Sequence, residues 1–430
     1  MPKHNVTILE NGLKLILRED SRVDSVAVVV GVRAGSYYET KETAGIAHFL
    51  EHMLFEGTKK YPTAKSLAER IEAIGGYSTA YTDRGYVVYS VKVRAKHLNI
   101  ALEYLSQIIF ESKLEEKAIN KEKRIVKEEI SQMMDAPERA IWEKWMKWVW
   151  GNNHSLGRSI LGDHKSIRKI NKFELSKYLH RYYVPNNMTL AVVGNFSKSE
   201  VKTSIQKYFV INSAKKSINV TQQWVLPRKI FHTKLESFDA LQVQMLCGFV
   251  TGISFSHKDR YIMQLITEIL SGGVSARIFQ KLVYELGIAY SVGAYDMQLN
   301  DTGIFFISGG VARENVDEAM KVIGDEIYNL RTIELTDEEL LMAKERAITK
   351  FSFLAEKTDD LAGLYVIQQM REGKTFSIKE LTENLMKVNS VDIKRVAQKY
   401  LCYSNLYIML CGPVKKDGVK FINGMFDKLQ

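Results

Sequence analysis

The pattern of apolar and polar positions predicts short strands and longer amphipathic helices in the first half of the chain. Residues 6–18 alternate around the turn Asn11-Gly12, which predicts a β-hairpin, and the apolar run 25–30 predicts a buried strand. Strands and helices occur in separate groups, so we expect an α+β fold rather than a doubly wound parallel sheet. Apolar residues at helical spacing predict helices at 43–55, 63–74, 97–110, 115–134 and 137–150.

Self-comparison of the chain reveals two copies of one helix–strand unit. Each copy reads as an amphipathic helix, a turn at an asparagine, and an apolar strand that ends in glycine. We therefore expect two tandem homologous domains, 1–212 and 230–430, each a mainly antiparallel sheet packed with helices, joined by a polar linker at 213–229. The aligned positions share one offset of 218 residues, pairing 170–175 with 388–393, Tyr182 with Tyr400, Asn187 with Asn405 and Gly194 with Gly412.

The segment His48-Phe49-Leu50-Glu51-His52 carries the clearest candidate chemistry. A helix turns about 100° per residue, so His48, Glu51 and His52 share one face. Two imidazoles four residues apart can reach one ion, zinc favours imidazole nitrogen, and the spacing is the inverted HxxEH zinc motif. The alternative is a pair of surface histidines beside a solvated glutamate. The surrounding apolar residues favour a buried helix, where unpartnered polar groups are costly and a metal would satisfy them.

A catalytic zinc site usually has three protein ligands, so the two histidines leave one position to be filled. The predicted helix at 115–134 offers Glu122, Glu128 and Glu129, which helical phase separates. Glu122 and Glu129 fall within the apolar stripe, whereas Glu128 points to the lysine-bearing side. We predict Glu129 as the third ligand and Glu122 as a residue behind the ligands that orients a histidine or a water, with a rim salt bridge as the alternative for Glu122. The apolar stripe is formed by Ile119, Val126, Ile130 and Met133.

Composition narrows the class of protein without identifying a site. A chain of 430 residues exceeds one typical core, which agrees with two domains. The net charge of +10 comes from lysines interspersed with glutamates, which indicates solvated helix surface, and we expect no nucleic-acid binding. No apolar run reaches 18 residues, so no membrane span is expected. Three cysteines and the absence of a signal-like N-terminus favour a cytoplasmic protein.

Four segments together make the chain resemble a known family over almost its whole length. The chain resembles the insulinase/pitrilysin-type zinc peptidases, most closely their short-chain bacterial and mitochondrial-processing-peptidase-like branch. The resemblance predicts a peptidase fold in which each chain has two homologous domains. The segments that carry it are 43–58 around the histidine motif, 126–130, 154–162 and 287–292.

The resemblance implies a role for each candidate residue in a zinc endopeptidase. His48, His52 and Glu129 would bind one Zn²⁺ per chain, in agreement with helical phase. Glu51 would be the general base, and Tyr290 would hydrogen-bond the tetrahedral oxyanion. The alternative for Tyr290 is a core aromatic residue.

The resemblance also implies how substrates are held. In the family, four domains enclose a chamber, so a two-domain chain forms half of a peptide-enclosing dimer. Short or unfolded peptides would add a strand to a sheet edge near the metal. Two positions depart from the family pattern, which usually has asparagine at Thr79 and an acidic residue at Gly85. The residues predicted to bind substrate are Gly76, Ser78, Thr79, Ala80 and Tyr81.

The second half departs further from the family. The arginine that the family places seven residues before its tyrosine is replaced here by Val283, which cannot bind a substrate carbonyl. In some short members, the metal motif and the arginine–tyrosine pair lie on different chains. We therefore predict either a homodimer or a heterodimer with a related chain that supplies this pair. At the 218-residue offset Glu129 meets Ala347, so the second domain lacks a copy of the metal site.

Other functions remain as alternatives. The main one is a catalytically silent structural or assembly subunit of the same fold, although such relatives typically lose a ligand or the base. A zinc-bound peptide-binding protein without turnover is a third possibility, and a nucleic-acid-binding module has only the net charge in its favour. The tryptophan-rich helix at 137–150 is expected to pack within the fold rather than line a chamber.

Overall fold

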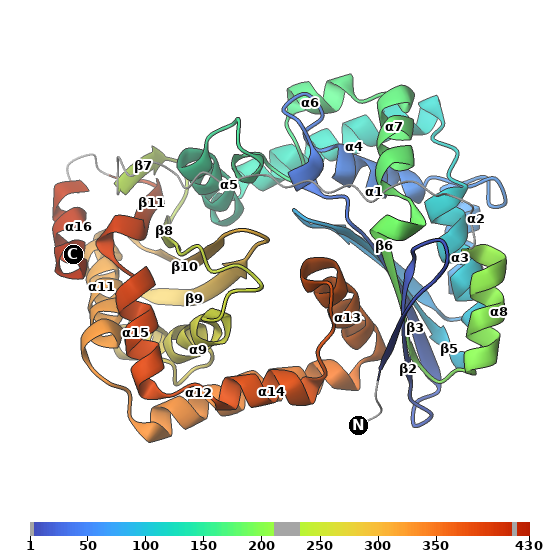
Figure 1. Ribbon diagram of the computed structural model, residues 1–430. Coiled ribbons are helices and arrows are strands. Elements are labelled where there is room, and N and C mark those ends of the chain that lie inside the picture. The colour runs from blue at the N-terminus through green and yellow to red at the C-terminus, as the bar shows by residue number, and fades with distance from the viewer. Residues whose placement is uncertain (1–3, 210–232, 415–418) are drawn as a thin grey trace. The chain divides into compact units, whose positions relative to one another are not determined.

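Two units, each built around its own β-sheet, make up the protein in a computed structural model that describes residues 4–209, 233–414 and 419–430 (Figure 1). The predicted linker at 213–229 lies outside the described residues. By their internal contacts, the first unit takes its chain from the spans Met1–Gln132, Gly151–Thr221 and Phe353–Ser377. The second unit takes Met133–Trp150, Gln222–Ser352 and Ile378–Gln430.

The first unit contains a six-stranded sheet in the order β1-β2-β6-β3-β5-β4. Only the β2–β6 pair is parallel, which confirms a mainly antiparallel sheet. The predicted hairpin forms β1 and β2, and Gly12 in its turn has a φ of 84°, in the region that favours glycine. Strand β4 lies at one edge and pairs only with β5 among the described strands. The strands are β1 (Asn5–Ile8), β2 (Lys14–Glu19), β3 (Ser25–Val32), β4 (Tyr77–Thr82), β5 (Val87–Arg94) and β6 (Met188–Gly194).

Helices pack on both faces of this sheet. Along β3, the residues Val26, Val28 and Val30 join one apolar core with the helices α1 and α3, because alternate strand residues face the same side. The predicted helices are confirmed here to within a few residues. The helices of this unit are α1 (Ile46–Leu54), α2 (Ala64–Glu72), α3 (Leu98–Phe110), most of α4 (Glu116–Asp135), α6 (His164–Lys169), α7 (Lys172–Tyr182), α8 (Lys198–Tyr208) and α13 (Thr358–Glu372).

Helix α13 comes from the second half of the sequence but belongs to the first unit, where it packs on β3 and β6. It covers the face that carries Gly31. A Cβ built at Gly31 would collide with Val366 Cγ1 and Met370 on this helix. Glycine at position 31 therefore allows close approach of the helix to the sheet.

We expect Gly31→Val to lower the free energy of unfolding by about 1–3 kcal/mol, because added atoms overpack the α13 contact. Chemical denaturation would measure this loss. Combining it with Val366→Ala should restore part of the stability. Gly363→Ala on the same helix is the control, because a Cβ there meets nothing within 4 Å, so stability should not fall. Equal stability of Gly31→Val and the native protein would contradict the packing argument.

The second unit contains a five-stranded sheet in the order β7-β11-β8-β10-β9, in which only β7–β11 is parallel. The strands are β7 (Thr233–Ser237), β8 (Val243–Val250), β9 (Ala289–Gln298), β10 (Gly303–Val311) and β11 (Leu406–Gly412). The helical segments are α5 (Pro137–Trp150), α9 (Arg260–Ser271), α10 (Arg277–Phe279), a π-helix at Gln280–Glu285, α11 (Val316–Thr332), most of α12 (Asp337–Glu356), α14 (Ile378–Met386), α15 (Ser390–Tyr400) and α16 (Val419–Phe426).

Helix α5 shows the converse arrangement. It comes from the first half of the sequence but belongs to the second unit, where it packs on β8 and β11. Trp145 is fully buried, and its indole N–H donates to the carbonyl of Tyr407 at 3.0 Å. Gly248 lies beneath this ring, and a Cβ there would collide with it. The expectation that the tryptophan-rich helix packs within the fold is therefore confirmed for Trp145.

The internal duplication is visible in matching hydrogen bonds. Asn187 and Asn405, each just before an apolar strand, donate their side-chain amides to the carbonyls of Tyr182 and Tyr400. Asn171 caps α7, and the aligned asparagine at position 389 caps α15 in the same way. Two tandem homologous α+β domains, the predicted fold class, are confirmed by these features.

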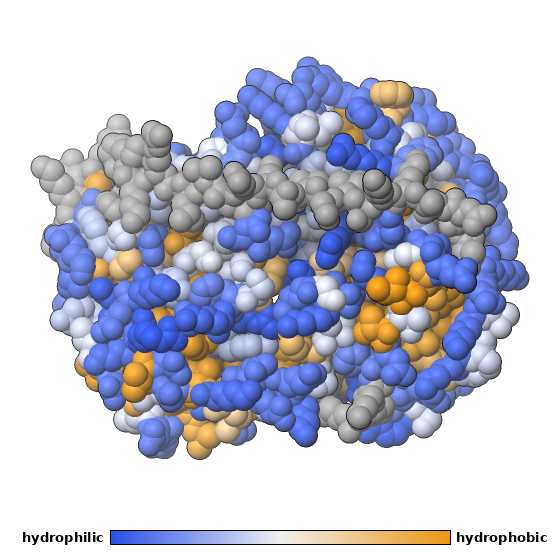
Figure 2. All heavy atoms as spheres, in the orientation of Figure 1, coloured by the Kyte–Doolittle hydropathy of each residue, from blue (hydrophilic) through white to orange (hydrophobic). Residues whose placement is uncertain are grey.

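The visible face of the protein is mostly hydrophilic, with apolar residues in separate areas (Figure 2). This distribution agrees with interpreting the interspersed lysines and glutamates as solvated surface. Among the described residues, no helix has the length and apolar character needed to cross a membrane.

Candidate metal centre

Helix α1 is held at its N-terminus by a buried carboxylate. The Glu39 side chain accepts hydrogen bonds of 2.9 Å from the backbone N–H groups of Gly45 and Ala47. These N–H groups have no partner within the helix, and the N-terminal dipole favours a negative charge. Burial raises the pKa of Glu39 to about 7, although the two N–H bonds and Arg158 act to lower it. Gly45 has a φ of 88°, which suits glycine at this tight entry.

The remaining faces of α1 are apolar and buried, so the helix has one fixed orientation. His48, Glu51 and His52 lie on the single half-buried face. The predicted burial of this helix is confirmed. The buried residues are Ile46, Ala47, Phe49, Leu50, Met53 and Leu54.

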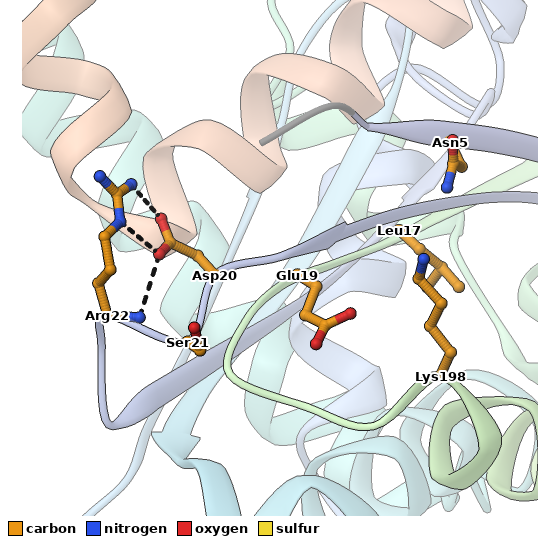
Figure 3. Close-up of a pocket in the computed structure, with 7 residues that line it drawn as sticks. All are labelled: Asn5, Leu17, Glu19, Asp20, Ser21, Arg22 and Lys198. Atoms are coloured by element: carbon orange, nitrogen blue, oxygen red, sulfur yellow. Dashed lines mark hydrogen bonds and ion pairs between the residues drawn. The ribbon is translucent and has the colours of Figure 1, made fainter. Parts of the chain in front are cut away.

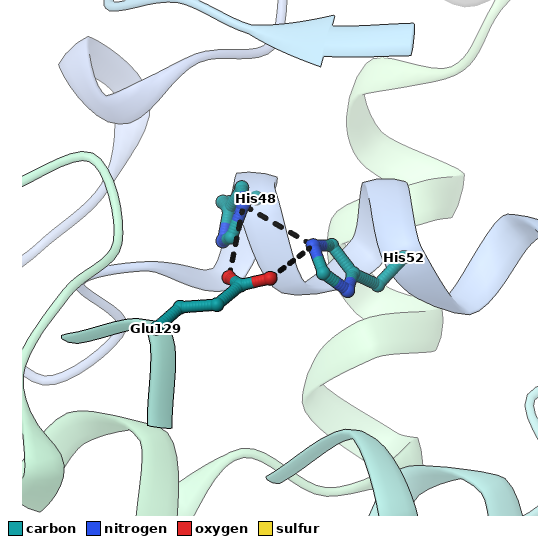
Figure 4. Close-up of side chains that lie close together, drawn as sticks. All are labelled: His48, His52 and Glu129. Carbon is teal, nitrogen blue, oxygen red and sulfur yellow. Dashed lines mark hydrogen bonds and ion pairs between the residues drawn. The ribbon is translucent and has the colours of Figure 1, made fainter. Parts of the chain in front are cut away.

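His48 and His52 converge with Glu129 of α4 on one point (Figure 4). The Nε2 atoms of the two histidines lie 3.2 Å apart. Each also lies 3.8 Å from one oxygen of the Glu129 carboxylate. Ligand atoms around a tetrahedral zinc ion would lie about 3.3 Å apart for bonds of about 2.0–2.1 Å. These three side chains therefore fit a zinc ion after small side-chain movements.

Among the described residues, His48, His52 and Glu129 are the one group of three potential ligands close enough together to hold a metal ion. Burial, followed by the neighbouring His52, lowers the pKa of His48 to about 3, so its imidazole is neutral. A neutral imidazole offers a lone pair to a metal. The lowered pKa of His48 and its position beside His52 and Glu129 therefore both suit a metal ligand.

Glu122 contacts the far side of His52. The carboxylate of Glu122 lies 3.0 Å from His52 Nδ1, so a proton on Nδ1 leaves Nε2 free to face the cluster. Burial acts to raise the pKa of Glu122, but hydrogen bonds from His52 and Lys121 outweigh it and hold the pKa below its usual value. Glu122 thus lies where a residue that orients a metal-binding histidine is expected.

Helical phase separates the two neighbouring glutamates of α4 as predicted. Glu129 is half-buried and faces the histidines, whereas Glu128 is exposed. Ile119, Val126 and Ile130 on the same helix are buried, so α4 is anchored along its apolar stripe. Met133, the fourth predicted member, is only half-buried.

Glu51 lies on α1 between the two histidines and is bound by a residue of β4. The hydroxyl of Thr82 donates to Glu51 Oε2 at 2.5 Å. Burial raises the pKa of Glu51, while the bond from Thr82 acts in the opposite direction. The base candidate is therefore held in place beside the cluster.

The residues predicted to bind substrate lie on or just before the edge strand β4. Tyr77, Thr79 and Tyr81 are exposed, while Ser78 and Ala80 are half-buried. The alternation shows that one face of the strand is exposed. Its place at the end of the sheet order leaves one edge unpaired among the described strands, as strand addition requires.

Tyr290 belongs to the second unit, at the start of the edge strand β9. Its side chain is 91 % exposed, so it is not the core aromatic residue considered as the alternative. Val283 lies in the π-helix before this strand and is partly buried against the core of that unit.

A separate pocket of about 370 Å³ lies at the opposite edge of the first sheet (Figure 3). The exposed side chain of Arg22 pairs there with the mostly buried carboxylate of Asp20 at 2.6 Å. None of its lining residues belongs to α1 or α4, so it is separate from the group formed by His48, His52 and Glu129. The lining residues are Asn5, Leu17, Glu19, Asp20, Ser21, Arg22 and Lys198.

Two residues around the cluster were missed by sequence reasoning. Glu39 and Thr82 contact α1 through the folded structure and belong to no metal motif. The available signal for Glu39 was a carboxylate seven residues before a glycine-capped helix. For Thr82 it was the strand alternation that places it on the same face as Ala80.

Comparison with known proteins gives consistent results along the chain. The profile of the insulinase family, peptidase family M16, matches residues 14–164, and the profile described as the peptidase M16 inactive domain matches residues 169–347. The Bacillus subtilis protein YmxG, described as an uncharacterized zinc protease, is 33 % identical over 388 residues, covering 90 % of this chain and 92 % of the relative.

A second relative is more distant. The probable β subunit of the mitochondrial-processing peptidase from Arabidopsis thaliana is 28 % identical over 426 residues, covering 96 % of this chain and 79 % of that protein.

Solved structures share the fold. A protease from Helicobacter pylori superposes with a TM-score of 0.88 at 22 % identity, over 96 % of this chain and all of that one. A Pseudomonas fluorescens structure described as a peptidase M16 inactive domain gives 0.87 at 18 % identity, over 95 % and 98 % of the two chains. With the family profiles and the bacterial relative, these matches show that the chain belongs to the insulinase family of peptidases, family M16.

Proposed function

We propose that this chain is a zinc-dependent endopeptidase that hydrolyses short or unfolded peptides. The observation that carries the proposal is the convergence of His48, His52 and Glu129, with Glu51 on the same helix face. The zinc protease relative from Bacillus subtilis supports the choice of metal. His48, His52 and Glu129 are proposed as the ligands, and Glu122 as the residue that orients His52.

Zinc, when bound, supplies a Lewis acid that polarises a carbonyl and lowers the pKa of water. The other steps fall to the protein. Glu51 takes a proton from the attacking water and transfers it to the leaving amine nitrogen. Burial raises the pKa of Glu51, and a carboxylate with a higher pKa holds the proton more readily between the two transfers.

We propose that the substrate binds as an added strand on β4. The unpaired edge of this strand would supply backbone hydrogen bonds along Gly76, Ser78, Thr79, Ala80 and Tyr81. Backbone bonding recognises an extended chain rather than one sequence, which favours short or unfolded peptides. An amide is absent at Thr79, so this position would contribute less side-chain bonding than asparagine does.

Tyr290 is proposed to hydrogen-bond the oxyanion that forms during hydrolysis. Its exposure leaves the hydroxyl available, while Val283 offers no side-chain donor beside it. We therefore propose a dimer that encloses the peptide, with a related partner chain supplying an arginine–tyrosine pair. The β subunit of the mitochondrial-processing peptidase is a relative of this chain, which favours a heterodimer over a homodimer.

A catalytically silent subunit of the same fold is the second candidate. The match of residues 169–347 to a domain described as inactive favours it for the second half. The first half argues against it, because His48, His52 and Glu129 lie close enough together to hold one metal ion. Glu51, the candidate base, lies on the same helix face as the two histidines.

We expect the purified chain to bind about one zinc ion and to cleave a mixture of unfolded peptides, with cleavage lost after chelation and restored by added zinc. Metal analysis and mass spectrometry of the peptide pool would measure both. Persistent cleavage by the metal-free protein would contradict a zinc mechanism, and zinc binding without cleavage, even with a related partner chain, would favour the silent subunit. A fully active homodimer of the chain alone would exclude the need for a heterologous partner.

A further inference from the structure

Strand β4 packs against the helix that carries the two histidines, and its last residue contacts the proposed base. The distance of 2.5 Å from Thr82 Oγ1 to Glu51 Oε2 lies within the range of a charge-assisted O–H···O⁻ hydrogen bond. Among the described residues, Thr82 is the one hydrogen-bond partner of the Glu51 side chain. A glutamate side chain has several rotatable bonds, so one strong bond restricts its carboxylate considerably.

The Thr82 hydroxyl is aimed at α1 by the strand itself. Ser78, Ala80 and Thr82 share one face of β4, and the Ser78 hydroxyl lies 3.2 Å from the Tyr104 hydroxyl on α3. Thr82 also pairs in register with Val87 of β5. The backbone that carries Thr82 is therefore fixed by the sheet and by the helices beneath it.

Helix α13 braces the same strand near both ends. The Tyr77 hydroxyl donates to Asp359 at 2.5 Å, and Asp359 also accepts from Lys92 of β5 at 2.7 Å. Just beyond the other end of β4, Arg371 lies 3.3 Å from Asp83. These bonds restrain β4 against sliding or lifting from β5, which keeps Thr82 in reach of α1.

We propose that Thr82 is a positioning residue that holds the Glu51 carboxylate beside the candidate metal ligands, so that the substrate strand and the base are fixed to each other. This inference rests on the proposed endopeptidase function. The methyl group and hydroxyl of threonine play separate parts here: the hydroxyl binds Glu51, and the methyl fills space. Valine and serine each keep one of the two.

The test compares Thr82→Val with Thr82→Ser. Valine keeps the shape and removes the donor, so kcat should fall about 10- to 100-fold while KM and zinc content stay within about twofold of the native values. Serine keeps the donor and should recover most of kcat. The control is Thr203→Val on the exposed face of α8, where the hydroxyl donates to the carbonyl of Ser199, and it should leave kcat unchanged.

A crystal structure of the zinc-free Thr82→Val protein supplies a readout independent of activity. We expect the Glu51 carboxylate to leave its native position, and to return to it in Thr82→Ser. An unmoved carboxylate in the valine variant, native kcat in that variant, or equal loss of kcat in both variants would each overturn the proposal. Lack of peptide cleavage by the native protein would instead contradict the proposed function, while the position of Glu51 would still decide the role of Thr82.

Discussion

Glu51→Gln is expected to abolish peptide hydrolysis while zinc stays bound. Glutamine keeps the size of the side chain and can still contact Thr82, but it cannot take a proton from water. A general base contributes about 10²- to 10⁴-fold to a rate, so kcat should fall by at least about 100-fold. Metal analysis of the variant should still give about one zinc per chain, because His48, His52 and Glu129 are unchanged.

The matched control is Glu69→Gln on α2, an exposed glutamate paired with Lys65. This change removes a similar charge at a solvated site and should leave kcat near its native value. Native activity in Glu51→Gln would show that Glu51 is not the general base. Loss of zinc together with activity would instead place Glu51 among the ligands.

Helical phase was the sequence feature that predicted the cluster best. The α1 and α4 segments are apolar on defined faces and free of internal proline, so their periodicity fixed which side chains share a face. That was enough to choose Glu129 over Glu128, and the structure brings Glu129 to both histidines. The chemical roles of these residues remain predictions that the variants above address.

Features that depend on tertiary approach were not predictable in the same way. The bounds of α5 follow from its own sequence, but nothing in its periodicity indicates that it covers β8 and β11 of the second unit. The reciprocal placement of α13 on β3 was missed for the same reason. A local pattern defines an apolar face, whereas the sheet that buries it is chosen by the whole chain.

The contact of Thr82 with Glu51 illustrates the same limit at the site. The two residues are separated by 31 positions, and their bond exists because β4 packs against α1. The sequence pattern placed Thr82 at the end of an edge strand but could not give its partner. A threonine with one short bond to a half-buried carboxylate is identifiable only from the three-dimensional structure.

Glu129→Gln is expected to weaken zinc binding strongly. Changes to residues that only support a metal ligand typically cost about 10- to 100-fold in affinity, so loss of a ligand carboxylate should cost more than about 100-fold. An amide oxygen is neutral and a poorer zinc ligand than a carboxylate, so the two histidines would hold the ion with less help. Competition with a chromogenic chelator would measure the affinity of each protein.

Glu128→Gln provides the control one residue away. Glu128 is on the same turn of α4 and loses the same charge, but its exposed side chain points away from the cluster. Its zinc affinity should stay within about threefold of native, because a solvated charge at this distance interacts weakly with the ion. If the two variants bound zinc equally well, Glu129 could not be the third ligand, and helical phase would have selected a carboxylate that merely lies near the site. A loss of zinc affinity in Glu129→Gln alone would instead show that a residue on the buried side of α4 binds the metal. The same side of α4 also contacts the histidine helix through Glu122 and His52.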